Sequence, residues 1–94
     1  MIAATLATWT LTVQLISPIL PSSIQKYSKI PTAAQCEQTA KDTWRAFHLF
    51  KHDHPSMEMQ TLCVARTKAG YKWKMNIICD ESMNCHTIRT EGKY

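Results

Sequence analysis

The sequence predicts an α+β fold: a small disulfide-stapled domain with one amphipathic helix packed on a three-stranded antiparallel meander, preceded by an apolar N-terminal segment. Residues 32–50 repeat apolar side chains at helical spacing, short runs after residue 60 alternate like strands, and four cysteines lie among them. A chain of 94 residues holds one domain and an appendage. We therefore divide it into an apolar segment at residues 1–20, an extended linker at 21–31 and the domain at 32–94.

Residues 32–50 form the predicted helix. Thr32 and Gln35 have the spacing of a capping box, in which each side chain accepts or donates at the other residue's backbone. Pro55 ends the helix, because it disfavours helical geometry in the residue before it. One face of the helix carries Cys36, Ala40, Thr43, Trp44, Phe47 and Phe50.

Three strands are expected after the helix, at residues 61–67, 71–79 and 85–90, with residues 91–94 frayed. Gly70 favours a three-residue hairpin loop, because glycine accepts the left-handed conformation that such a loop needs. This register gives one face for contact with Trp44 and Phe47. The face consists of Cys63, Ala65, Trp73, Met75, Ile77 and Cys79.

The first 25 residues contain no charged side chain, and three interpretations compete for them. As a helix, residues 2–20 would be about 28 Å long, close to the thickness of a bilayer core. As a strand, residues 8–15 alternate strictly, which places Trp9, Leu11, Val13 and Leu15 on one face that binds a partner. The third interpretation is a cleaved signal peptide, although no Lys or Arg precedes the apolar run.

Four cysteines allow three disulfide connectivities. We favour Cys36 with Cys63, joining the helix to the first strand, and Cys79 with Cys85, closing the second hairpin. The alternative joins Cys36 to Cys79 and Cys63 to Cys85. Either scheme predicts an oxidising compartment. A zinc site is the competing use of cysteine here, with His48, His52, His54 and His86, but the spacings match no zinc-finger pattern.

Basic side chains surround the tip of the first hairpin. Arg66, Lys68, Lys72 and Lys74 are interleaved there with aromatic residues, and no acid occurs between residues 59 and 79. Such a cluster can bind an acidic partner. The plainer interpretation is a solvated outer face on which lysine discourages aggregation. A net charge of +4 is too small to predict a dedicated nucleic-acid binder.

No catalytic signature emerges, and with only two glycines there is no phosphate-binding loop. We therefore expect no enzyme, no cofactor, no bound metal and no small-molecule substrate. The leading hypothesis is a non-enzymatic accessory or structural subunit of a membrane complex or virus-like particle. It would be attached through residues 1–20 to other subunits and face the periplasm or exterior. The alternative is a secreted binding module, an inhibitor or effector, with a basic hairpin that contacts an acidic partner.

Overall fold

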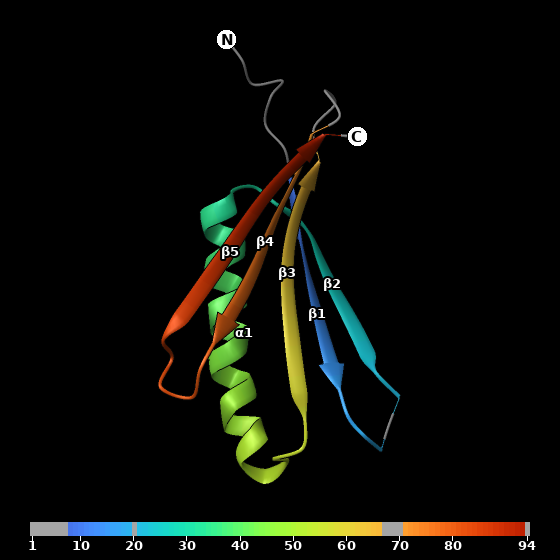
Figure 1. The fold of residues 1–94 in the computed structure, drawn as a ribbon, viewed down its shortest axis with the longest axis vertical. Coiled ribbons are helices and arrows are strands. Elements are labelled where there is room, and N and C mark those ends of the chain that lie inside the picture. The colour runs from blue at the N-terminus through green and yellow to red at the C-terminus, as the bar shows by residue number, and fades with distance from the viewer. Residues whose placement is uncertain (1–7, 20, 67–70, 94) are drawn as a thin grey trace.

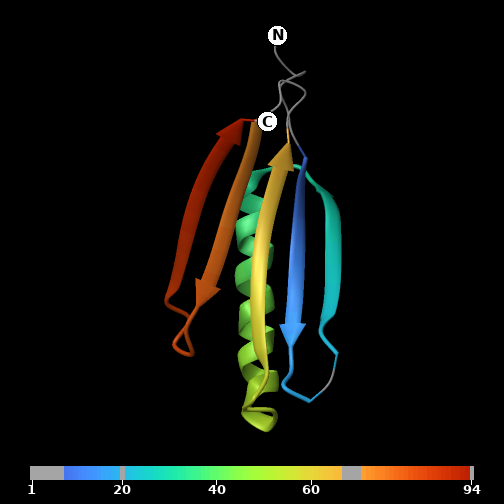
Figure 2. The same cartoon turned by 45° about the vertical axis from the view of Figure 1, so that its right-hand side comes forward.

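The computed structural model describes residues 8–19, 21–66 and 71–93 and shows one helix on one face of a five-stranded antiparallel sheet (Figures 1 and 2). The strand order is β2-β1-β3-β4-β5. The α+β class and the packing of one helix on an antiparallel sheet are confirmed, and the predicted number of three strands is wrong. The elements are β1 (Trp9–Ile16), β2 (Ser23–Ile30), α1 (Ala33–Asp53), β3 (Glu58–Arg66), β4 (Tyr71–Cys79) and β5 (Cys85–Lys93).

β1 is an interior strand of the sheet and pairs antiparallel with β2 on one side and β3 on the other. Its alternation of β-branched and apolar residues buries Leu11 and Val13 beneath α1 and turns Thr10 and Thr12 to the opposite face. The predicted apolar segment standing before the domain is therefore wrong over residues 9–16. The buried side of this strand is apolar because it packs against α1. Residues 1–7 lie outside the described part of the chain.

β2 was the strand least predictable from the sequence, because seven of its eight residues are exposed. It forms one edge of the sheet, where the predicted linker was placed. The register slips between Trp9, which pairs with Ile30, and Leu11, which pairs with Tyr27. Lys29 has φ 63° at this point, so the extra residue of β2 is held as a β-bulge with a non-glycine residue in the left-handed region.

The helix begins as its sequence signal predicts. Thr32 is the N-cap, and its Oγ1 accepts a hydrogen bond of 3.1 Å from the Gln35 backbone N–H. The helix ends at Asp53, three residues beyond the predicted range, and His54 caps it through a backbone bond to Lys51. Figure 2 shows α1 running along the sheet, where it packs mainly on β3 and β4.

Two disulfides connect the pairs that the sequence favoured. Cys36 bonds Cys63, with both residues fully buried between α1 and β3, and Cys79 bonds Cys85 across the β4–β5 turn. The predicted face of the first hairpin is also confirmed, since Cys63, Met75 and Ile77 lie in the core. β5 continues to Lys93, beyond the predicted end of the third strand.

A buried polar group is tied into this core. The Trp44 Nε1–H lies 2.9 Å from Thr61 Oγ1 and 3.0 Å from the Ile77 carbonyl oxygen. The Thr61 hydroxyl donates to the same carbonyl at 2.6 Å. Because each of these polar atoms has a partner, Trp44 can be buried without the cost of an unsatisfied donor, and its position relative to β3 and β4 is fixed.

Candidate functional site

The face of the sheet opposite α1 carries no covering element in the part of the chain that the structure describes. Figures 1 and 2 show α1 on one side of the five strands and no helix on the other. Strand alternation assigns the residues between the buried positions to this side, which we call the open face. Its apolar members are Ile16, Ile24, Leu62, Val64, Ile78 and Ile88, of which Ile24, Ile78 and Ile88 are 58, 46 and 56% exposed.

Most of the positive charge assigned to the open face lies at one end, while Lys26 lies on the edge strand β2. Arg66 at the end of β3 pairs with Lys72 near the start of β4, and Lys74 follows two residues later beside Val64. We call Arg66, Lys72 and Lys74 the basic end. The acid assigned to this face by alternation within the described strands is Glu58, at the other end of β3. Lys68, predicted to join the cluster, lies outside the described residues, as does the predicted Gly70 turn.

The four N-terminal residues predicted to dock on a partner do lie on one side of β1, but that side faces α1. Leu11 and Val13 are 0 and 4% exposed and belong to the core. Trp9 and Leu15, at the ends of the strand, are half-buried and pack against that core. This corrects the prediction for Leu11 and Val13, because the chain's own helix occupies the surface that their side chains would offer a partner.

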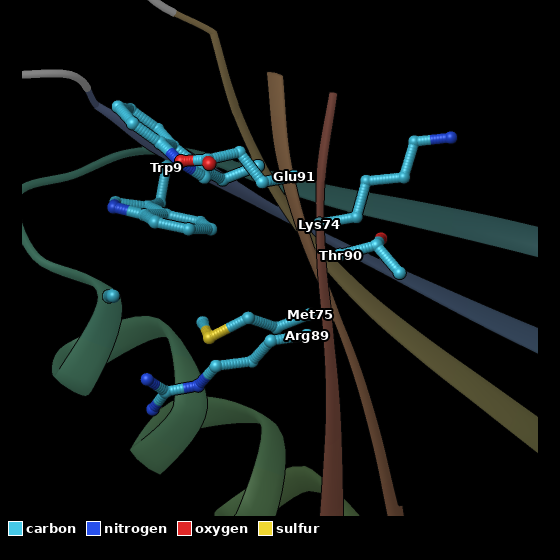
Figure 3. A pocket seen from close by; sticks show the side chains of 8 residues that line it. Trp9, Lys74, Met75, Arg89, Thr90 and Glu91 are labelled. Atoms are coloured by element: carbon cyan, nitrogen blue, oxygen red, sulfur yellow. The ribbon is translucent and has the colours of Figure 1, made fainter. Parts of the chain in front are cut away.

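A groove of about 500 Å³ lies at the end of the sheet beside the start of α1 (Figure 3). Figure 3 shows Trp9, Met75 and Arg89 on one side of the strands, with Lys74 and Thr90 directed to the other side. The sequence did not predict this groove, because its walls come from segments far apart in the chain. They are Trp9, Ala33, Trp73, Lys74, Met75, Arg89, Thr90 and Glu91.

Two of the charged groups around this groove, Arg89 and Glu91, have partners within the fold. The Trp73 Nε1–H donates to the Glu91 carboxylate. Glu37 on α1 accepts a hydrogen bond from the Thr87 hydroxyl and lies 3.9 Å from the Arg89 guanidinium. The contacts of Glu37 hold β5 to the helix, and the bond between Trp73 and Glu91 joins β4 to β5. The groove is therefore the helix-facing side of the β5 edge.

The turn between β4 and β5 is organised by Asp80. Its Oδ1 accepts hydrogen bonds of 2.9 Å from the backbone N–H groups of Ser82 and Asn84. These bonds, with that from Asn84 the largest cause, lower the pKa of the Asp80 carboxyl below its ordinary value of 3.8. Met83, with φ 62°, adopts the left-handed conformation and completes the turn. The carboxylate therefore acts structurally here.

The residues weighed for a zinc site are not gathered into one. Cys79 and Cys85 are bonded to each other, and His48 uses Nε2 to donate to the Cys79 carbonyl oxygen at 2.9 Å. Within the described residues, no three histidine, cysteine or acidic side chains are grouped as metal ligands. The same part of the chain contains no helix that is both long and apolar enough to cross a membrane.

Comparison with known proteins gives no match: no family model, curated protein or solved structure matches the chain. The class is therefore defined by the fold and its surfaces. It is a small disulfide-stapled α+β domain with one helix-covered sheet face and one open face. The two disulfides indicate an oxidising compartment, such as the extracellular space or the periplasm.

Proposed function

We propose that the chain is a secreted, non-enzymatic binding module whose open face contacts an acidic partner protein. The observation that carries the proposal is the basic end on a sheet face that no described element covers and that also exposes Ile24, Ile78 and Ile88. Exposed apolar residues bordered by charge are typical of protein interaction surfaces. Positive charge on one end of the face favours acidic partners and speeds their association.

The disulfides support this role, because small secreted domains depend on such bonds to present a stable surface. Leu62 and Val64 lie half-buried on this face, Leu62 between Thr12 and Asn76 and Val64 between Thr10 and Lys74 of the neighbouring strands. The open face is therefore a continuous mixed surface across β3 and β4. The hypothesis of an accessory subunit attached through residues 1–20 loses part of its basis, since β1 is committed to the sheet. Membership of a larger assembly remains a prediction.

The proposal is tested with fluorescent polyglutamate as a defined acidic probe. A Lys72→Glu/Lys74→Glu variant reverses charge at the basic end. We expect it to weaken binding at least about tenfold, because the reversed charges repel the probe. The matched control is Lys41→Glu/Arg45→Glu on α1, which makes the same change in net charge away from the open face. Fluorescence anisotropy at physiological salt measures both dissociation constants.

The control variant is expected to bind the probe within about twofold of the unchanged protein, because charges distant from the binding surface are largely screened at physiological salt. Equal losses in the two variants would refute the proposal, because binding would then follow total charge and no particular surface. Near-ultraviolet circular dichroism checks that each variant keeps its folded core.

A further inference from the structure

The edge of the sheet formed by β5 differs from the edge formed by β2. β2 carries Lys26 and Lys29 and is interrupted by the bulge at Lys29, features that discourage strand addition. The β4–β5 ladder runs from Tyr71 paired with Lys93 to Cys79 paired with Cys85 without a register shift, and β5 contains no proline. Figure 2 shows β5 at the outer edge, with no described segment beside it.

The ladder also shows which backbone groups of β5 face outward. The Asp80 N–H donates to the Asn84 carbonyl oxygen at 3.1 Å, so the next pair, Cys79 with Cys85, is a non-hydrogen-bonded pair. Its Cα separation of 4.0 Å agrees with this assignment. Alternation along the strand then makes Thr87 and Arg89 non-hydrogen-bonded positions as well. Their backbone N–H and C=O groups point away from β4, toward the free edge.

We propose that β5 binds an extended segment of a partner protein as a sixth strand, through the outward backbone groups of Thr87 and Arg89. This inference rests on the proposed function and specifies the mode of contact. Backbone hydrogen bonds along a free edge provide affinity in such complexes, and alternate side chains provide specificity. The edge is regular over nine residues, long enough to pair with a strand of ordinary length.

The open face determines the chemistry of that segment. A partner residue opposite Ile88, which is 56% exposed, would lie on the open face and gain from an apolar side chain. A partner residue opposite Thr90 would lie on the same face near Lys74, since Thr90 pairs with Lys74. An acidic side chain suits that position. The partner segment is therefore an extended strand with an acidic end and a β-branched apolar end.

On the other face of β5, negative charge is already present. Glu37 contacts Thr87 and Arg89, and Glu91 accepts the bond from Trp73. Glu37 and Glu91 outnumber Arg89 on this face, so an acid gains less there than near Lys74, and the residues of the partner that point to this face should be uncharged. A labelled peptide of sequence Glu-Thr-Glu-Thr-Val-Thr-Val meets both requirements when it runs antiparallel to β5. The matched control peptide has lysine in place of each glutamate.

The test uses the complete oxidised protein and this peptide. Thr87→Pro removes an outward N–H and places a ring where the new strand must lie, while leaving the β4 ladder its donors. Thr87→Ala also loses the hydroxyl contact with Glu37 but keeps the N–H. We expect the proline variant to weaken peptide binding at least about tenfold and the alanine variant to remain within about twofold.

Hydrogen exchange on the unchanged protein makes the test independent of how well the proline variant folds. Peptide binding should slow exchange at the amides of Thr87 and Arg89, while that of Ile88, already bonded to β4, changes little. The inference would be overturned if this protection were absent or if the lysine peptide bound equally well. Unchanged peptide binding by a folded Thr87→Pro protein would also overturn it. A dimer of the free protein that Thr87→Pro abolishes would also overturn it, because a second copy would then occupy the edge.

The result for the basic end separates the two proposals. If Lys72→Glu/Lys74→Glu abolishes peptide binding and Thr87→Pro does not, the open face binds an acidic partner without strand addition. If neither variant weakens binding of its probe, polyglutamate for Lys72→Glu/Lys74→Glu and the peptide for Thr87→Pro, both proposals are wrong.

Discussion

The disulfide between Cys36 and Cys63 is expected to contribute more to stability than the disulfide between Cys79 and Cys85. The first closes 27 residues of sequence and the second closes 6. In the chain-entropy model, these loops correspond to about 3.5 and about 2.2 kcal/mol of stabilisation. Cys36 and Cys63 are also fully buried, so their replacement adds the loss of packed sulfur atoms to the entropic term.

This difference is measured with two double variants, Cys36→Ala/Cys63→Ala and Cys79→Ala/Cys85→Ala. Urea unfolding followed by tryptophan fluorescence gives the free energy of unfolding for each variant and for the unchanged protein. Folded proteins have about 5–15 kcal/mol in total, so an entropic loss of about 3.5 kcal/mol would remove roughly a quarter to roughly 70% of the stability. A loss below about 1 kcal/mol for the first variant, or a larger loss for the second, would refute this reasoning.

Three further outcomes are expected. Trp44→Phe removes the indole donor to Thr61 and the Ile77 carbonyl and should lower the free energy of unfolding by about 1–3 kcal/mol, measured by urea denaturation; no loss would show that these bonds are dispensable. Asp80 has a lowered pKa in the folded state, so its contribution is present above the ordinary value of 3.8 and is lost as pH falls through the folded pKa. Asp80→Asn should therefore flatten the fall in melting temperature on acidification, and an unchanged acid profile would contradict this. Nitrogen NMR of His48 in its neutral form should show the proton on Nε2, because that atom donates to a carbonyl oxygen; the Nδ1–H tautomer would contradict the packing of α1 on β4.

The parts of the fold that follow from local sequence were predictable. The Thr32 cap and the spacing of Cys36, Ala40, Trp44 and Phe47 identify the helix, because capping and amphipathicity depend on residues close in sequence. The alternation of β3 and β4 identified the core face of the hairpin, and the position of the cysteines on that face allowed the disulfide pairing to be predicted. Each of these signals lies within one element or one hairpin.

The two N-terminal strands were harder to predict for opposite reasons. β1 is uncharged and apolar enough to resemble a membrane segment, and composition does not distinguish a lipid environment from the interior of a sheet. β2 has seven exposed residues, so it leaves no periodic pattern of burial. Its place depends on pairing with β1, a contact that no property of its own sequence encodes.

The surfaces were predictable only in part. The basic end could be predicted, because Arg66, Lys72 and Lys74 belong to one hairpin. The groove beside Trp9 and Trp73 and the free edge of β5 could not, because they depend on the order of strands in the sheet.

Native-state hydrogen exchange of β1 shows whether this uncharged stretch belongs to the folded domain. β1 pairs on both sides, so the amides of Leu11, Thr12 and Val13 should exchange as slowly as those of Leu62 and Cys63 in β3. Fast exchange at residues 11–13, with β3 still protected, would show that the N-terminal stretch stands apart from the domain and would contradict the account.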